Sequence, residues 1–268
     1  MEVGISTASL FRRAYTEDAP ALLRGAGTAF CEIFLNTFSE YEPGYIDLLC
    51  ERVAAQNLRV LAVHPQSLQF EPQLFSIYDR QREDALMFYR KILHAGQKLG
   101  AKYYVLHGSA TLGGAAKNIQ VERLAKHYQL LCDTAGEYGL TLTQENVSWC
   151  NSQTPDFGLR LQEQMGNRDL KFTLDCKQAR RAGQEPMAFI EAWGDQIVHW
   201  HLCDYAPNPA GGHQWRMPGQ GVCDFAALAR ALRAKGYRGA AMLEVYSDMY
   251  SDLDELAASY DYLRNILP

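Results

Sequence analysis

Short apolar runs alternate with longer stretches of helical spacing along the whole chain. Eight runs have the length and side chains of strands, at 2–6, 30–35, 58–64, 102–108, 140–146, 171–175, 197–202 and 239–246. Between several of them, apolar side chains recur every three or four residues, at 46–57, 82–100 and 121–139. The pattern therefore predicts eight strands that alternate with helices.

This alternation predicts a parallel sheet, because parallel strands need long, usually helical, connections. Eight strand and helix units within 268 residues fit a closed (βα)₈ barrel better than an open doubly wound sheet. No GxGxxG sequence follows the first strand, and no linker or change of composition interrupts the pattern. We expect an α/β protein with a single TIM-barrel domain over residues 1–268.

Composition and charge narrow the class of partner. The net charge of -5 argues against a non-specific electrostatic hold on nucleic acid, but not against a small phosphorylated substrate. Seven scattered cysteines contain no CxxC pair, which favours a reduced, cytoplasmic setting. The N-terminus lacks the features of a signal peptide, and no apolar stretch approaches the roughly 18 residues that span a bilayer. We expect no membrane association.

Six of the predicted strands end in an ionisable residue: His64, His107, Glu145, Asp175, His201 and Glu244. A single residue of this kind is more often structural than functional. In a closed barrel, however, the carboxyl ends of all strands surround one mouth, where catalytic groups gather. The six side chains are therefore candidates for one site.

Three carboxylates and one imidazole in this set suggest a metal centre. Glu145, Asp175, Glu244 and His201 provide the mixture of oxygen and nitrogen donors that suits Mn²⁺, Mg²⁺ or Co²⁺. Carboxylates placed so close together would repel one another without a cation. We expect one divalent ion, Mn²⁺ first, with Mg²⁺, Co²⁺ or Zn²⁺ as alternatives.

Five segments resemble a known family: TQENVSW (143–149), FTLDCKQARRAG (172–183), VHWHLCDY (198–205), MPGQGVCDF (217–225) and MLEVY (242–246). They are similar to the sugar isomerase and epimerase branch of the xylose-isomerase-like TIM barrel superfamily, which also contains ketose 3-epimerases and endonuclease IV. The resemblance implies that Glu145, Asp175, His201 and Glu244 are the metal ligands. It also implies that Glu145 and Glu244 transfer protons through a metal-bound enediolate.

Two positions depart from the pattern of relatives. Gln178 stands where many relatives carry a second histidine three residues after the aspartate. His213 and Trp215 stand where endonuclease IV has an Asp-x-His pair for further zinc ions, so a trinuclear zinc cluster is not expected. The resemblance matches His64 and His107 to early zinc ligands of endonuclease IV, but relatives without that activity use such histidines to bind substrate.

Six residues are predicted to bind the substrate: His64, His107, Gln178, Asp204, Trp215 and Arg216. Arg216 presents a fork of donors suited to hydroxyl or phosphate groups, or is a solvated loop residue. Trp215 would stack on a sugar face or cover the mouth, and Asp204 would bind substrate or orient Arg216. Lys177 is either an anion-binding residue or part of a salt bridge.

Three further residues accompany these candidates: Glu32, His199 and Cys203, the last of which lies past the end of its strand. Glu32 in the second strand is expected to point inward, near the site or in a buried ion pair. His199 lies one layer deeper than His201 and is interpreted as a hydrogen-bonded support. Cys203 is read as a small core residue.

The leading hypothesis is a metal-dependent isomerase or epimerase of a sugar, sugar phosphate or keto sugar. The alternative is a lyase of the same family, similar to dehydroshikimate or inosose dehydratases. An endonuclease IV-like AP endonuclease and a non-catalytic sugar-binding protein are less favoured. The resemblance further suggests a homodimer or homotetramer.

Overall fold

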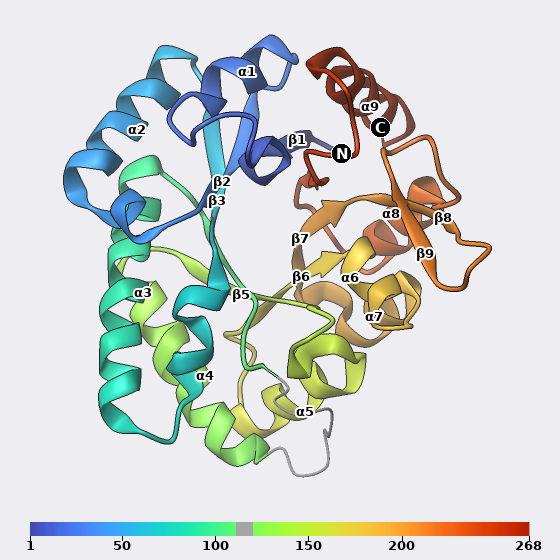
Figure 1. Cartoon of the computed structure of the whole chain (residues 1–268). Helices are drawn as coiled ribbons and strands as arrows, with labels where there is room; N and C mark the ends of the chain where they lie inside the picture. Colours follow the sequence, from blue (N-terminus) through green and yellow to red (C-terminus); the bar gives the residue numbers. More distant parts are fainter. Residues whose placement is uncertain (111–119, 268) are drawn as a thin grey trace.

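The computed structural model describes residues 1–110 and 120–267. Eight parallel strands close into a barrel in the order β1-β10-β7-β6-β5-β4-β3-β2 (Figure 1). Their bounds are β1 Val3–Ser6, β2 Phe30–Leu35, β3 Arg59–Pro65, β4 Tyr103–Leu106, β5 Thr141–Glu145, β6 Lys171–Asp175, β7 Ile197–Leu202 and β10 Ala241–Leu243. All eight predicted strands are present, and the (βα)₈ fold is confirmed.

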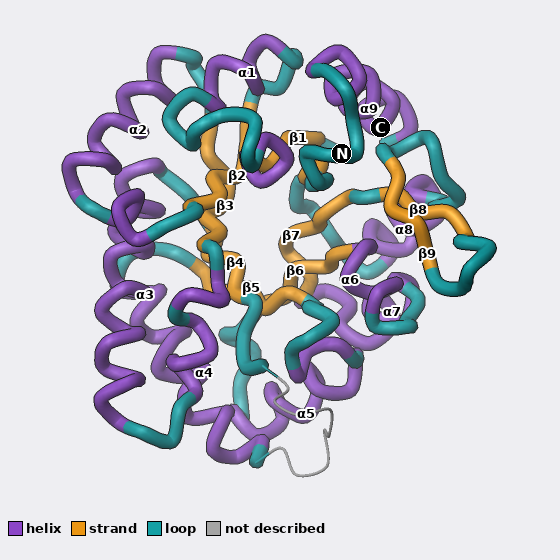
Figure 2. The backbone as a smooth tube through the Cα atoms, viewed as in Figure 1, coloured by secondary structure: helices purple, strands orange, loops and turns teal. Residues whose placement is uncertain are grey.

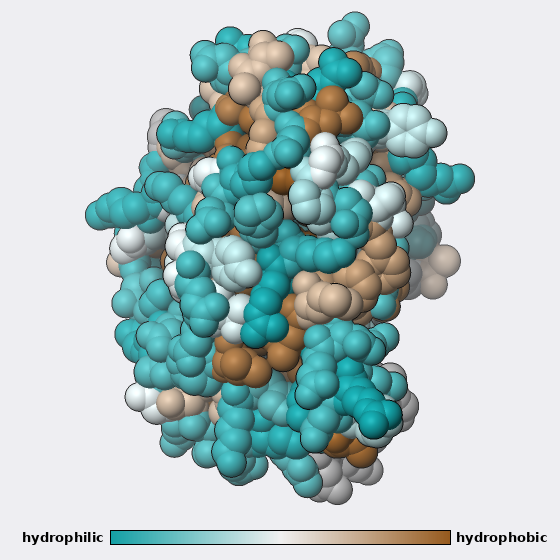
Figure 3. Space-filling model, turned by 90° about the vertical axis from the view of Figure 1, so that its left-hand side faces the viewer, coloured by the Kyte–Doolittle hydropathy of each residue, from teal (hydrophilic) through white to brown (hydrophobic). Residues whose placement is uncertain are grey.

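Helices surround the ring of strands on its outer side (Figure 2). They are α1 Ala19–Gly25, α2 Pro43–Ala55, α3 Asp79–Leu99, α4 Val121–Glu137, α5 Pro155–Met165, α6 Cys176–Arg181, α7 Pro186–Trp193, α8 Phe225–Ala234 and α9 Leu253–Ile266. The face formed by α2 and α3 is mostly hydrophilic, with scattered apolar groups (Figure 3). Within the described ranges, no helix is long and apolar enough to cross a membrane.

An apolar layer fills the barrel near the amino ends of its strands. Phe30, Leu61, Ala240 and Met242 form a separate buried cluster there. A Cβ atom on Gly4 would lie 2.7 Å from the Phe30 ring, so the first strand needs glycine at this position. Apolar residues therefore occupy one end of the barrel interior, and the polar candidates lie toward the other end.

A small antiparallel hairpin, which the sequence analysis did not predict, follows the seventh barrel strand. It consists of β8 (Asp204–Pro207) and β9 (His213–Arg216), with Asp204 opposite Arg216. In Figure 1 the hairpin projects away from the ring of strands. The chain therefore leaves the barrel directly after β7 instead of entering a helix.

Candidate active site

The four predicted metal ligands meet at the carboxyl ends of β5, β6, β7 and β10, around the ring of His201. His201 Nδ1 lies 3.2 Å from Glu145 Oε1, 3.0 Å from Glu244 Oε2 and 3.9 Å from Asp175 Oδ2. All four residues are at least nine-tenths buried. Closure of the barrel thus brings together side chains that are up to 99 residues apart in sequence, from Glu145 to Glu244.

Local contacts hold these strand ends in register. Asn146, next to Glu145, accepts a hydrogen bond from the backbone N–H of Asp175 at 2.6 Å and donates one to its carbonyl oxygen at 2.9 Å. Glu244 follows β10, and its N–H donates to the carbonyl of Leu202 at 3.0 Å. The backbone therefore fixes where the carboxylates project.

One oxygen of each carboxylate has no hydrogen-bond partner within the described part of the chain. These atoms are Glu145 Oε2, Asp175 Oδ2 and Glu244 Oε2, all buried. A buried carboxylate oxygen without a partner is costly, unless a cation takes the place of water. Three such oxygens beside an imidazole fit a divalent ion, which favours oxygen donors and tolerates one nitrogen.

The pKa values in the cluster reflect crowded negative charge. Burial, with the charges of Glu145 and Glu244, raises the pKa of Asp175 to about 7, although Lys177 opposes the shift. Burial would lower the pKa of His201, but Glu244 and the other nearby carboxylates raise it well above its usual value. Burial also opposes ionisation of Glu145, but the hydrogen bond from His201 and the nearby histidines hold its pKa low. The site thus favours added positive charge.

Glu32 lies inside the barrel, behind His201, and contacts three histidines. Its Oε2 is 3.1 Å from His201 Nε2 and 2.8 Å from His199 Nε2, and its Oε1 is 3.4 Å from His64 Nδ1. Ser6 donates to Oε1 at 2.9 Å. Glu32 is fully buried, so these contacts take the place of water around its carboxylate. Glu32 therefore points inward, and His199 supports it from the deeper layer.

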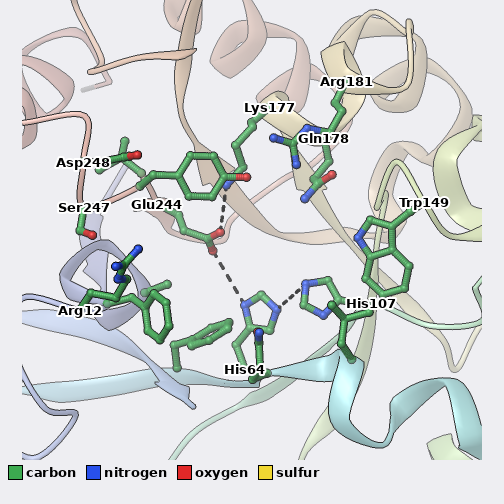
Figure 4. A pocket seen from close by; sticks show the side chains of 17 residues that line it. Arg12, His64, His107, Trp149, Lys177, Gln178, Arg181, Glu244, Ser247 and Asp248 are labelled. Carbon is green, nitrogen blue, oxygen red and sulfur yellow. Dashed lines mark hydrogen bonds and ion pairs between the residues drawn. The ribbon is translucent and has the colours of Figure 1, made fainter. Parts of the chain in front are cut away.

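His64 and His107 lie side by side at the mouth, where Figure 4 shows them facing Glu244 and Trp149. Their Nε2 atoms are 3.2 Å apart, and His107 Nε2 is 3.3 Å from Glu145 Oε2. Burial and the charge of His64 lower the pKa of His107 to about 3. His107 is therefore neutral near pH 7 and can donate or accept one hydrogen bond.

Helix α6 begins at the proposed aspartate ligand and carries two further site residues. Asp175 Oδ1 accepts the N–H of Gln178 at 2.7 Å, which caps the helix and leaves Oδ2 for the site. Lys177 Nζ lies 3.3 Å from Glu244 Oε1 and 3.9 Å from Asp175 Oδ2, in a buried ion pair. The Gln178 side chain accepts from the N–H and hydroxyl of Ser148 at 3.2 and 2.9 Å.

A pocket of about 400 Å³ opens over this cluster. Predicted residues that line it are His64, His107, Gln178 and Glu244, together with Lys177. Residues that the sequence analysis did not select also line it, among them Tyr246 and the three residues Arg12, Trp149 and Arg181, which are labelled in Figure 4. Trp149 lies within the TQENVSW segment, but no periodicity or spacing singles out Arg12 or Arg181.

Three predicted substrate-binding residues lie elsewhere. Asp204, Trp215 and Arg216 do not line the pocket, because the chain from Asp204 onward leaves the barrel as the hairpin. Both Asp204 oxygens accept backbone N–H groups, and the exposed Arg216 donates to Gln214 at 2.6 Å. The substrate contacts predicted for these three residues, and the orientation of Arg216 by Asp204, stay predictions.

Comparison with known proteins identifies relatives of this fold. The family described as "Xylose isomerase-like TIM barrel" matches residues 20–266. An uncharacterized protein of Mycobacterium leprae is 34% identical over 36% of this chain, and the match spans only 35% of the length of that protein. Inosose dehydratase of Lacticaseibacillus casei is 24% identical over 63% of this chain and 64% of its own length.

Solved structures share the whole fold. A D-tagatose 3-epimerase-like protein has a TM-score of 0.81 at 18% identity, covering 100% of this chain and 97% of its own. An IolI protein with a bound zinc atom has a TM-score of 0.78 at 20% identity, covering 100% and 98%.

Proposed function

Since the chain belongs to the xylose isomerase-like TIM barrel family, we propose that it is a divalent-metal-dependent isomerase or epimerase of a sugar or sugar derivative. The observation that carries this proposal is the set of three buried carboxylate oxygens without a hydrogen bond among the described residues, Glu145 Oε2, Asp175 Oδ2 and Glu244 Oε2, which lie beside the rings of His201 and His107. Glu145, Asp175, Glu244 and His201 would hold the ion, with Mn²⁺ as the first choice. Its contribution when bound is that of a Lewis acid, which draws electron density from substrate oxygens.

In this proposal, two glutamates transfer the proton of the substrate carbon next to the carbonyl. Glu145 and Glu244 reach the site from separate strands, and each keeps one unpaired oxygen in it. Glu145 has a low pKa, so it is ionised near pH 7 and can accept a proton from carbon next to a carbonyl. Glu244 would return a proton to the other face in an epimerase, whereas one glutamate suffices in an isomerase.

Neutral groups complete the substrate site. His107 is uncharged near pH 7, so it can hydrogen-bond a substrate hydroxyl without adding charge. Gln178 also lines the pocket and offers an amide instead of the histidine of many relatives.

All seven cysteines are free, which supports a reducing, cytoplasmic setting for this chemistry.

Proton exchange in deuterated water tests the proposal. Mn²⁺-loaded and metal-free protein are incubated with ketoses, keto acids and their phosphates, and loss of the C1–H or C3–H signals next to the carbonyl is followed by NMR. We expect Mn²⁺-dependent exchange that Glu145→Gln and Glu244→Gln each reduce by at least about 100-fold, whereas the exposed control Glu137→Gln leaves it unchanged.

Two results would contradict this assignment. Absence of metal-dependent exchange on every compound would remove the isomerase and epimerase classes. Loss of water from a substrate, detected by mass, would place the protein among the lyases.

A further inference from the structure

Two arginines line the pocket without a carboxylate partner. Arg12 comes from the turn after the 3-10 helix Thr7–Leu10, and Arg181 ends helix α6. In Figure 4, Arg12 lies on the side of Ser247 and Arg181 on the side of Gln178. No acidic side chain among residues 1–110 and 120–267 forms an ion pair with either one, although Asp248 also lines the pocket. Their charges are therefore available to a ligand.

The neighbouring arginine shows how Arg181 differs from an ordinary helix-end residue. Arg180 forms an ion pair with Glu185 and also contacts His213 Nε2 at 2.9 Å. Arg181 instead lies over aromatic rings, with its Cζ 5.3 Å from the centroid of Trp215 and 5.9 Å from that of Tyr246. Aromatic rings hold the guanidinium in place but do not neutralise it.

Arg12 lies in a turn that hydrogen bonds join to the loop after β10. Its φ of 69° lies in the left-handed region, which an arginine rarely adopts. The next residue, Arg13, donates to the carbonyl oxygens of Ser247, Tyr250 and Ser251, and so fastens this turn to the loop after β10. The turn that carries Arg12 is therefore joined to the loop that carries Ser247 and Asp248.

A short chain of contacts connects Arg181 to the candidate reaction site. The ring centroid of Tyr246 lies 5.9 Å from Arg181 Cζ and 4.5 Å from Lys177 Nζ. Lys177 Nζ in turn lies 3.3 Å from Glu244 Oε1. Glu244 and Asp175 already compensate the charge of Lys177. Among the described residues that line the pocket, Arg12 and Arg181 are therefore arginines without a carboxylate partner, and Arg181 is the one that these contacts connect to Glu244.

We propose that Arg181 binds an anionic group of the substrate, with Arg12 adding positive charge from the other side of the pocket, so that the substrate is a sugar phosphate or a sugar acid and not a neutral sugar (Figure 4). Guanidinium groups match the paired oxygens of phosphate and carboxylate groups. A pocket of about 400 Å³ has the size of small-molecule sites, so the carbonyl end can lie beside Glu244 while the anion lies at Arg181. This inference rests on the proposed function, which places the reacting end.

Calorimetric titration with three matched sugars tests the subsite in Mg²⁺-loaded protein. The probes are D-fructose, D-fructose 6-phosphate and 2-keto-D-gluconate, and the two anions distinguish phosphate from carboxylate. We expect one anion to bind at least about 10-fold more tightly than D-fructose. Arg181→Gln should weaken binding of that anion roughly 10-fold and Arg12→Gln should weaken it less, whereas Arg160→Gln on the exposed side of α5 should not.

Inorganic phosphate serves as a fourth probe that requires no sugar specificity. Its binding, followed by ³¹P NMR, should disappear in the Arg12→Gln, Arg181→Gln double variant. The inference is overturned if no anion binds in an arginine-dependent way, or if the arginine variants weaken D-fructose as much as the anions.

Exchange in deuterated water, measured on the same samples, separates this inference from the proposed function. Metal-dependent exchange on D-fructose without any preference for anions would leave the function standing and remove the anion subsite. Arginine-dependent anion binding without exchange on any probe would keep the subsite and remove the isomerase assignment.

Discussion

Glu32 determines which nitrogen of His201 faces the candidate metal site. Its carboxylate lies 3.1 Å from His201 Nε2 and 2.8 Å from His199 Nε2. A carboxylate accepts hydrogen bonds, so Nε2 must carry the proton and Nδ1 is left to face the three carboxylates. Partners of this kind orient metal-binding histidines and raise their basicity.

We expect Glu32→Gln to weaken Mn²⁺ binding roughly 10- to 100-fold, because the amide no longer fixes the ring and its proton. Isothermal titration gives the affinity, and circular dichroism verifies the fold. Glu40→Gln is the matched control, since Glu40 is also buried but contacts Thr16 and Asn36 outside the site. Wild-type Mn²⁺ affinity in folded Glu32→Gln protein would contradict the orienting role.

Asp204 has a structural role that its place in the sequence did not reveal. Oδ1 accepts N–H groups of Tyr205 and Cys223 at 2.8 and 2.9 Å, and Oδ2 accepts those of Gly219 and Gly221 at 3.1 and 3.0 Å. Asp204→Asn places an NH₂ group against backbone donors. We expect the free energy of unfolding in urea to fall by about 2–4 kcal/mol, with little change in ligand affinity. Unchanged stability with lost ligand binding would instead favour a substrate contact.

At the residue scale, predictability depends on whether a side chain is tied to a strand end. Glu145, Asp175, His201 and Glu244 each stand at or beside such an end, so the order of strands alone predicts that they meet. Arg12 and Arg181 lie in a turn and at the end of a short helix, where direction depends on local backbone geometry. That geometry, including the positive φ of Arg12, has no signature in the sequence.

At the element scale, a buried carboxyl group joins the 3-10 helix Glu71–Phe75 to the end of β4. Tyr104 donates its hydroxyl to Glu71 Oε1 at 2.9 Å, and the backbone N–H of His107 donates to Oε2 at 3.0 Å. Burial raises the pKa of Glu71 to about 8. The folded protein therefore holds a proton that the unfolded chain releases at lower pH.

This raised pKa predicts a pH dependence of stability. An acid whose folded pKa exceeds its unfolded value stabilises the fold at low pH and loses that effect as the pH rises. We expect the free energy of unfolding to fall by about 1.4 kcal/mol per pH unit between about 4.5 and 8 through Glu71. Glu71→Gln should remove this slope, because the amide stays neutral and the Tyr104 hydroxyl can accept from it.

Urea unfolding at a series of pH values measures the difference between wild type and Glu71→Gln, which isolates Glu71 from other titrating groups. The exposed control Glu137→Gln should follow the wild-type profile. Parallel profiles for wild type and Glu71→Gln would show that Glu71 is ionised in the folded protein.

The elements differ in how strongly the sequence predicts them. Barrel strands such as β3 and β4 are buried almost throughout and contain the apolar runs VLAV and YYVL, which stand out from the helices. The hairpin strands have four residues each; β9 alternates between partly buried and exposed positions, whereas β8 begins with two buried residues, Asp204 and Tyr205. Only the turn between them, with Gly211 and Gly212 at positive φ, carries a local signal, in the sequence NPAGG.

At the scale of the whole molecule, the candidate metal site joins distant parts of the barrel. Its four proposed ligands come from β5, β6, β7 and the end of β10, and the contact between β10 and β1 closes the ring. In the unfolded chain these side chains are far apart and bind a cation weakly. A cation that binds only the folded state stabilises the whole barrel, and relieves repulsion among Glu145, Asp175 and Glu244.

Metal removal should therefore lower the melting temperature of the entire protein. At a free Mn²⁺ concentration of about 100 times the dissociation constant, binding contributes about 2.7 kcal/mol, which corresponds to roughly 5 to 10 °C for a domain of this size. Scanning calorimetry with Mn²⁺ and with EDTA measures the shift. Glu244→Gln should abolish most of it, because one carboxylate is lost, whereas Glu137→Gln should retain it. Equal melting temperatures under both conditions would show that these strand ends do not hold a metal ion.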